Sequence, residues 1–250
     1  MKFVRFRQDN RIAYGLVEGE NIRTIDGDPF SGHTPTDEVV SLGSVRLLAP
    51  CEPSKIVAVG VNYLDHAAEF KKELPKEPLL FLKPSTSVRD PQEPILLPSR
   101  SRRVDYEAEL AVVIRKRAAH IAPEEAPEFI LGYTCINDVT ARDLQKEDGQ
   151  WTRAKGFDTF APLGPWIVTD ISPDNLKIES YLNGERRQSA STAQLIFKVP
   201  ALVSFISEVM TLLPGDVIAT GTPAGVGPMR SGDTIEVVID GIGRLINPVQ

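Results

Sequence analysis

Short strand-like segments separated by turn residues dominate this chain, and they constrain its fold more than any other feature. Near the N-terminus MKFVRFR, IAYGLVEG and NIRTIDG alternate apolar with polar residues, as half-buried strands do. IVAVGVN at 56–62 and the end of DYEAELAVVI at 105–114 are almost continuously apolar, which is typical of strands buried on both faces. One amphipathic helix is predicted over 200–212. This pattern favours a β-rich α+β fold over a doubly wound α/β fold.

The N-terminal part is predicted to be a β-meander that forms a separate small domain. It is followed by a Pro- and Gly-bearing stretch with Gly32 and Pro35, and then by LLAPCEPSK, a connector interrupted by prolines. We therefore expect a small N-terminal β domain over 1–48 and a larger domain over 49–250. A chain of 250 residues is long enough for both.

The charge balance, and the lack of a predicted membrane span or signal peptide, narrow the class of protein. The net charge is −6 and the pI is about 5.2, with no basic tract, which argues against nucleic-acid and anionic-membrane partners. No apolar run approaches the ~18 residues of a membrane span, and the first residues lack the apolar region of a signal peptide. Two cysteines, Cys51 and Cys135, make no disulfide framework. We expect a soluble cytoplasmic protein.

Three carboxylates carry the strongest chemical signal. Glu107 and Glu109 are two residues apart on a predicted strand, so their side chains share a face. They could be a solvated edge, but adjacent carboxylates repel unless a cation lies between them. Asp138 ends an otherwise apolar strand, where a carboxylate needs a partner. The three together suit Mg²⁺, Mn²⁺ or Ca²⁺, whereas the histidines and cysteines show no zinc-ligand spacing.

Further candidate residues have weaker signals. His66 and Glu69 are three apart on a predicted helix, so the carboxylate could orient the imidazole as a general base; an exposed surface pair is the alternative. Lys83 and Lys155 could each stabilise a developing enolate, or could be ordinary surface lysines. The glycine-rich GTPAGVG at 221–227 could bind an anion through backbone N–H groups, although its glycines also suit a tight loop.

Taken together, the motifs resemble those of the fumarylacetoacetate hydrolase family from about Lys55 to Leu245. The segments that carry the resemblance are VGVNYLDHAAE, FLKPS, DYEAEL, NDVTARDLQ, DGQWTRAKGFDTFAPLGP, NGERRQ with LIF, and PGDVIATGTPAGVG. The resemblance implies a mixed β-sandwich roll, a homodimer, and an N-terminal part like the small domain of bacterial members. The larger domain would then be the catalytic one.

The resemblance also implies roles for individual residues. The family's acidic trio, which binds Mg²⁺ or Mn²⁺, falls on Glu107, Glu109 and Asp138. Its His-x-x-Glu dyad, carried on a mobile lid, falls on His66 and Glu69. Residues that would act on or contact the substrate are the active-site lysine, Lys155, and the substrate-binding Lys83, Arg142, Gln145 and Thr222.

The family includes several chemistries on related substrates. Acylpyruvate hydrolases, oxaloacetate decarboxylases, 2-hydroxyhepta-2,4-diene-1,7-dioate isomerases and ureidoglycolate lyase-like members share much of this pattern. The segment DGQWTRAKGFDTFAPLGP resembles that of hydrolase or decarboxylase members. It therefore favours these two activities over that of an isomerase. A 2-oxo acid would chelate the metal. The metal and the Lys155 ammonium would then stabilise the enolate formed on bond cleavage. A catalytically silent protein that binds metal and oxo acid is a further alternative, and a phosphate-binding role for GTPAGVG a weaker one.

Overall fold

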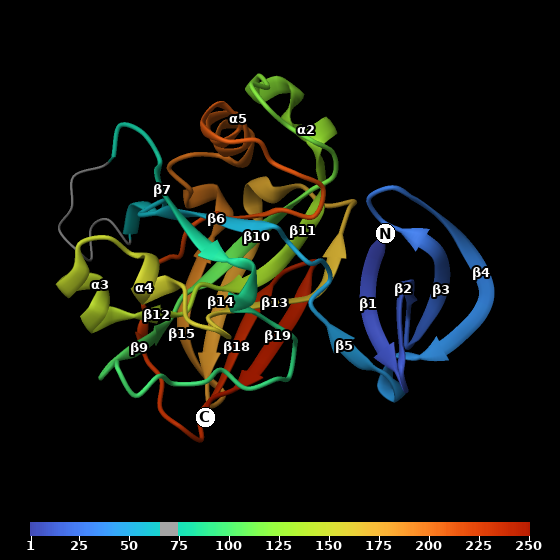
Figure 1. Ribbon diagram of the computed structural model, residues 1–250, viewed down its shortest axis with the longest axis horizontal. Coiled ribbons are helices and arrows are strands. Elements are labelled where there is room, and N and C mark those ends of the chain that lie inside the picture. Colours follow the sequence, from blue (N-terminus) through green and yellow to red (C-terminus); the bar gives the residue numbers. More distant parts are fainter. Residues whose placement is uncertain (66–74) are drawn as a thin grey trace.

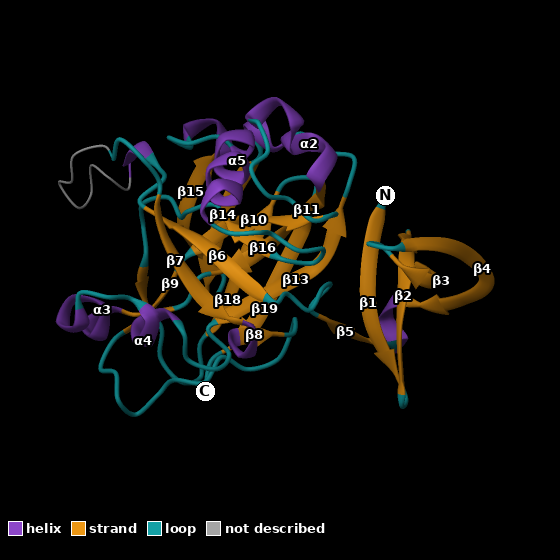
Figure 2. Cartoon of the chain, turned by 45° about the horizontal axis from the view of Figure 1, so that its top comes forward, coloured by secondary structure: helices purple, strands orange, loops and turns teal. Residues whose placement is uncertain are grey.

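Strands make up most of the regular structure (Figure 2). The computed structural model describes residues 1–65 and 75–250. The strands are β1 Lys2–Gln8, β2 Arg11–Glu18, β3 Asn21–Asp28, β4 Gly32–Ser41, β5 Arg46–Leu48, β6 Lys55–Gly60, β7 Leu79–Pro84, β8 Val88–Arg89, β9 Val104–Tyr106, β10 Ala108–Ile114, β11 Ile130–Asn137, β12 Thr140–Ala141, β13 Ala161–Val168, β14 Lys177–Leu182, β15 Glu185–Ser191, β16 Val217–Ala219, β17 Gly227–Pro228, β18 Thr234–Ile239 and β19 Gly243–Pro248. The predicted β-rich α+β class is confirmed.

The helices that lie wholly within the described part of the chain are few and short. They are α2 Ala126–Phe129, α3 Arg142–Asp148, α4 Thr152–Lys155 and α5 Val199–Val209, with the 3-10 turns η1 Leu42–Ser44, η2 Ser85–Ser87, η3 Pro123–Glu125, η4 Pro173–Asn175 and η5 Thr192–Gln194. Helix α5 matches the predicted amphipathic helix, and its buried face includes Val203 and Ile206. No helix among the described residues is long and apolar enough to cross a membrane.

One large sheet runs through the molecule, in the order β4-β3-β2-β1-β13-β11-β10-β16-β6-β7. The N-terminal strands form a separate lobe in Figure 1, but they belong to this sheet because β1 pairs antiparallel with β13. That junction is short, with Lys2 opposite Val168 and Phe3 opposite Ile167. Strand β5 pairs with β1 and leads the chain back toward the larger part.

Strand β4 differs from the sequence-based expectation. The stretch with Gly32 and Pro35 was predicted to be a connection, yet it forms a strand that pairs with β3, with Pro35 opposite Ile25. Proline lacks the N–H that an interior strand must donate, so it is confined to sheet edges and bulges. Strand β4 is the outermost strand of the large sheet, and the β3–β4 register shifts nearby. An edge position therefore accommodates a residue that argued against a strand.

A second sheet, β15-β14-β18-β19, faces the centre of the large one. Strand β10 is buried on both faces because its alternate residues enter two cores. Leu110 and Val112 pack with Ile178 of β14 and Val237 of β18, while Ala111 and Val113 belong to the core on the other face. This sandwich holds β10 between two apolar layers.

The chain departs from the large sheet at Glu107. The apolar alternation predicted one strand over 105–114, but the structure ends β9 at Tyr106 and starts β10 at Ala108. The N–H of Glu107 donates to the side-chain Oδ1 of Asn137 at 2.9 Å, and β9 joins a separate small sheet with β12 and β17. This break lies where the candidate catalytic residues gather.

Candidate active site

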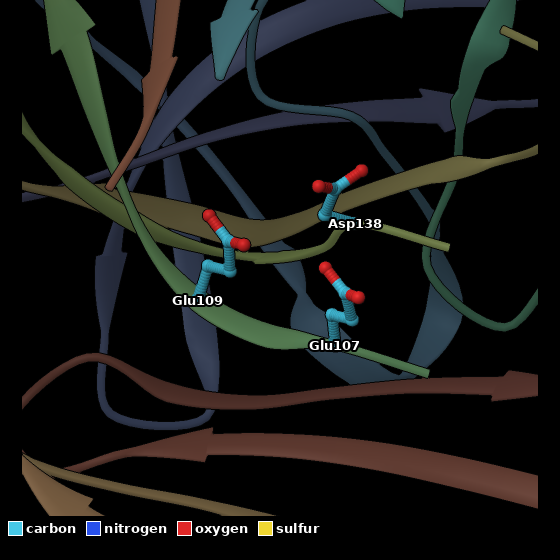
Figure 3. A group of neighbouring side chains, drawn as sticks. All are labelled: Glu107, Glu109 and Asp138. Carbon is cyan, nitrogen blue, oxygen red and sulfur yellow. The ribbon is translucent and has the colours of Figure 1, made fainter. Parts of the chain in front are cut away.

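Three buried carboxylates lie next to one another where β10 begins and β11 ends (Figure 3). Glu107 precedes β10, Glu109 is its second residue, and Asp138 directly follows β11. One oxygen from each lies within 4.8 Å of the others. Antiparallel pairing of β10 with β11 places Ala108 opposite Asn137 and Glu109 opposite Ile136, and Asp138 donates its N–H to the carbonyl oxygen of Glu107 at 2.9 Å. Asp138 therefore lies across from Glu107 and diagonally from Glu109. The pairing register thus assembles the trio that the sequence predicted.

Two buried lysines lie against the trio. Lys155, the last residue of α4, places its Nζ 2.9 Å from Glu107 Oε2 and 2.5 Å from Asp138 Oδ2. Lys83 of β7 places its Nζ 2.7 Å from Asp138 Oδ1 and donates to the carbonyl oxygen of Val139 at 3.1 Å. Burial lowers the pKa of Lys83, partly offset by Asp138. Burial alone would lower the pKa of Lys155 too, but Asp138 and Glu107 raise it above its usual value, so Lys155 is an ammonium.

Arg142 links the trio to a fourth buried carboxylate. Its Nε donates to Asp105 Oδ2 at 2.9 Å, its Nη2 pairs closely with Glu107, and its Nη1 donates to Gln145 Oε1 at 2.7 Å. Arg103 also pairs with Asp105, at 2.8 Å. The cluster therefore contains four acidic and four basic side chains, whose formal charges cancel: Asp105, Glu107, Glu109 and Asp138 against Lys83, Arg103, Arg142 and Lys155.

Glu109 is the carboxylate with the least compensation. Its Oε2 accepts the N–H of Gly221 at 2.7 Å, but within residues 1–65 and 75–250 no Lys or Arg forms an ion pair with it. Burial raises the pKa of Glu109 well above its usual value, and the negative charges of Asp138 and Glu107 raise it further. Glu107 differs: burial raises its pKa, but Lys155 and Arg142 outweigh that and hold it well below the usual range. Among the described residues, Glu109 is thus the member of the trio that lacks a cationic partner.

This donor set fits a hard divalent cation. Oxygen ligands lie about 2.0–2.6 Å from Mg²⁺ or Ca²⁺, so ligands across an ion are about 4–5 Å apart, in line with the 4.8 Å span of the trio. A dication would compensate Glu109, whose charge the lysines leave unpaired. The same oxygens that contact Lys155 keep second lone pairs. Glu107, Glu109 and Asp138 could therefore hold a metal ion beside Lys155.

A cavity of about 240 Å³ opens onto the trio. Its lining residues are Val59, Gly60, Val61, Phe81, Glu107, Glu109, Asp138, Arg142, Gln145, Lys146, Trp151, Lys155 and Thr222. The volume is just below the ~300–1,000 Å³ of drug-sized ligand pockets, which suits a small acid. One wall is charged and the other is apolar, so the cavity can orient a ligand whose two ends differ.

Three residues in contact, Gly60, Trp151 and Phe81, form part of the apolar wall. The indole ring of Trp151 meets the Phe81 ring edge-on, with centroids 5.2 Å apart, and Lys155 Nζ lies 4.8 Å from the centroid of Phe81. The indole also lies close to Gly60, where an added Cβ would be 2.8 Å from Trp151 Cζ3. Only a residue without a side chain leaves room for the ring here. Gly60 therefore sets the position of this wall.

We expect Gly60→Ala to raise KM, because the new methyl must displace the indole from the cavity wall. A misplacement of about 1 Å near a reacting group can cost up to ~10²-fold in rate. Gly43→Ala is the matched control, since its Cβ would meet nothing closer than 3.9 Å. The double variant Gly60→Ala with Trp151→Leu should recover part of the lost kcat/KM; an unchanged KM in Gly60→Ala would contradict the assignment.

The structure brings most of the sequence-predicted residues together. The trio, Arg142, Gln145, Lys155 and Thr222 line the cavity, whereas Lys83 lies behind Asp138 and does not line it. His66 and Glu69, and most of the helix predicted around them, lie outside the described residues. Sequence reasoning missed the aromatic wall of Phe81 and Trp151, although both fall inside the quoted motifs FLKPS and DGQWTRAKGFDTFAPLGP.

The comparison with protein families now identifies the class of protein. The family model for the fumarylacetoacetate (FAA) hydrolase C-terminal domain matches residues 55–250, and the model named Rv2993c-like, N-terminal matches residues 1–50. The chain therefore belongs to the fumarylacetoacetate hydrolase family of enzymes.

Individual relatives match over most or all of the chain. The chain is 47% identical to Protein Rv2993c of Mycobacterium tuberculosis over 259 residues, covering 100% of this chain and 98% of that protein. It is 45% identical over 224 residues to oxaloacetate tautomerase fahd2, mitochondrial, of Xenopus laevis, covering 84% of this chain and 70% of that protein. The structure of 5-carboxymethyl-2-hydroxymuconate delta-isomerase from Mycobacterium smegmatis superposes with a TM-score of 0.94 at 46% identity, covering 100% and 99%.

Proposed function

We propose that this protein is a divalent-cation-dependent enzyme that stabilises the enolate of a small 2-oxo acid. The observation that carries the proposal is the buried trio facing the Lys155 ammonium in a cavity of about 240 Å³. The side chains of the cluster balance one another in charge, so a bound dication would make the site net positive. A net positive, partly apolar cavity attracts an anion with a short carbon chain.

The cation would be Mg²⁺ or Mn²⁺, held by Glu107, Glu109 and Asp138. When bound it would supply Lewis-acid stabilisation of the substrate carboxylate and keto oxygens. The protein supplies the surroundings of that charge: carboxylates with fixed partners, and the apolar wall that includes Phe81 and Trp151. In such a site a charged group acts more strongly than in bulk water.

Lys155 would complete the stabilisation of negative charge. Its Nζ is held by Glu107 and Asp138 at the cavity surface, and those partners keep it protonated. A fixed ammonium favours the state in which negative charge has moved onto the keto oxygen, and it needs no reorganisation to do so. Proton transfer and carbon–carbon cleavage both pass through that state, so Lys155 would serve either reaction.

Two fates of the enolate have separate support. Proton transfer, meaning tautomerisation or isomerisation, is favoured by the names of the relatives, an oxaloacetate tautomerase and a hydroxymuconate isomerase. Hydrolysis of an acylpyruvate or decarboxylation of oxaloacetate is favoured by the DGQWTRAKGFDTFAPLGP motif. Hydrolysis needs an activated water, and the sequence-predicted base for it is His66 oriented by Glu69. Decarboxylation needs only the stabilised enolate.

A substrate panel separates these reactions. Purified protein, with Mg²⁺ or Mn²⁺ and with EDTA as control, is given oxaloacetate and acetylpyruvate. Ultraviolet absorbance follows the enol and keto forms of oxaloacetate, while pyruvate and acetate are quantified as products. We expect metal-dependent turnover in at least one assay. Metal binding without any turnover would instead support the non-catalytic metal and oxo-acid binding protein.

We also propose that the protein is a homodimer. Strand β7 ends the large sheet, and its Leu79 and Leu82 remain 51% and 45% exposed. An edge strand with exposed apolar side chains is a liability unless it is covered, and a second copy of the chain would cover it. Light scattering coupled to size-exclusion chromatography measures the mass directly; a monomer at micromolar concentration would contradict this proposal.

A further inference from the structure

The backbone of Ala108, between Glu107 and Glu109, lies where the large sheet loses a strand. Strand β10 pairs with β11 from Ala108 onward, but on its other side it pairs with β16 only at Ala111–Val113. In an antiparallel ladder the N–H and C=O of one residue point to the same side. The N–H and C=O of Ala108 point away from β11, to the side that β16 does not reach. A buried N–H or C=O without a hydrogen-bond partner is costly, so both groups need another partner.

The side chain of Gln188 provides the missing partner. Ala108 N donates to Gln188 Oε1 at 3.1 Å, and Gln188 Nε2 donates to Thr222 Oγ1 at 2.7 Å and to the carbonyl oxygen of Pro223 at 2.8 Å. Thr222 Oγ1 then donates to the carbonyl oxygen of Ala108 at 2.9 Å. Three of these bonds, from Ala108 N to Gln188, from Gln188 to Thr222 and from Thr222 back to Ala108, form a closed ring. The fourth anchors the Gln188 amide to Pro223. One amide and one hydroxyl thus take the place of a neighbouring strand.

The direction of every bond in this ring is fixed. A backbone N–H only donates and a carbonyl oxygen only accepts, so Ala108 and Pro223 determine which end of the Gln188 amide is oxygen. Nε2 must therefore donate to Thr222, and the Thr222 hydroxyl proton is left for Ala108. Thr222 was predicted to bind substrate, but its only proton is already committed within the protein.

The residue next to the ring, Gly221, also forms a hydrogen bond with Glu109. Gly221, next to Thr222, donates its N–H to Glu109 Oε2 at 2.7 Å. Gln188 itself comes from β15 in the opposite sheet and is 1% exposed. The position of the two glutamates thus depends on a side chain from the other layer of the sandwich.

We propose that Gln188 is a positioning residue of the cation site, acting on Glu107 and Glu109 through the Ala108 peptide and the Thr222 hydroxyl. This inference rests on the proposed function, because it presumes that the trio binds a divalent cation. Gln188 does not touch the cavity. Its contribution is to keep the start of β10 in the register that directs both carboxylates to one point. Removal of such supporting groups typically lowers metal affinity by ~10–100-fold.

The first test compares two buried amides by calorimetric titration with Mn²⁺. Asn247 is the matched control: it is also 1% exposed, and its Nδ2 donates to the carbonyl oxygens of Asp90 and Glu93 at 2.9 and 2.8 Å. We expect Gln188→Ala to weaken Mn²⁺ binding by ~10–100-fold and Asn247→Ala to leave it within about twofold. Equal affinities in the two variants would overturn the inference.

A second pair of variants tests the ring if Gln188→Ala does not fold. Thr222→Ser keeps the hydroxyl, whereas Thr222→Val removes it with little change in shape. Thr222→Val should weaken Mn²⁺ binding by ~10-fold or more relative to Thr222→Ser, and equal binding would overturn the inference. A wild-type protein that binds no Mn²⁺ would instead refute the proposed function, so the two failures are distinguishable.

Discussion

Glu109→Gln is expected to abolish catalysis while making the metal-free protein more stable. The amide keeps an oxygen for the Gly221 N–H but removes a buried charge that faces Glu107 and Asp138. Because burial and the charges of Asp138 and Glu107 raise the pKa of Glu109, its ionised form costs folding free energy near neutral pH, and the amide removes that cost. The same change should remove the stabilisation by Mg²⁺, about 2.7 kcal/mol at a hundredfold excess over Kd. Urea unfolding with and without Mg²⁺ measures both effects.

A second buried glutamate provides the control. Glu179 is also buried, but Lys177 and Arg186 pair with it at 3.1 and 3.2 Å. Glu179→Gln should therefore lower stability slightly and leave the response to Mg²⁺ intact. If Glu109→Gln destabilised the metal-free protein, or kept its full response to Mg²⁺, the role of Glu109 as an uncompensated carboxylate that binds the cation would be wrong.

Lys155→Met should lower kcat/KM by about 10²–10³-fold for every substrate that turns over, the cost of losing one group that stabilises an oxyanion. The methionine keeps the length of the side chain without its charge. Because proton transfer, hydrolysis and decarboxylation share the enolate, their rates should fall by similar factors. Steady-state kinetics with oxaloacetate and acetylpyruvate under saturating Mg²⁺ provide the measurement. A loss confined to one reaction would mean that Lys155 acts on something other than the enolate.

His66→Ala makes the contrasting prediction from the sequence. A general base that activates water contributes about 10²–10⁴-fold, so hydrolysis of acetylpyruvate should fall by that factor. Decarboxylation needs no water and should fall much less. The ratio of the two activities therefore changes in His66→Ala but not in Lys155→Met. An equal loss of both activities in His66→Ala, with Mn²⁺ affinity intact, would refute the assigned role.

The acidic trio could be predicted because it depends on local rules. Glu107 and Glu109 are two residues apart at the start of a strand, and Asp138 ends another strand. The antiparallel register that joins the strands then places them together. The break at Glu107 could not be predicted, because it depends on the Asn137 side chain 30 residues away. Alternating apolar residues indicate a strand but not the point at which it changes sheets.

The remaining parts of the site depend on contacts between distant segments. Lys83 and Lys155 follow ordinary patterns, and nothing local indicates that both contact Asp138. Gln188 lies in a hairpin strand of charged residues, GERRQ, which is typical of a solvated surface. Its burial follows from the packing of one sheet on the other. The periodicity of apolar residues predicts which face of a strand a residue occupies. It does not predict which segment of the chain packs against that face.

The short junction between β1 and β13 has a consequence for any shortened form of this protein. Residues 1–48 are an obvious piece to remove, but they supply Lys2 and Phe3, which pair with the backbone of β13 at Ile167 and Val168. Phe3 and Ile167 also share one apolar cluster. A truncated chain would present an open strand edge beside newly exposed apolar surface, the combination that templates aggregation. Poor solubility of such a fragment would therefore reflect a lost lateral neighbour and not a damaged catalytic part.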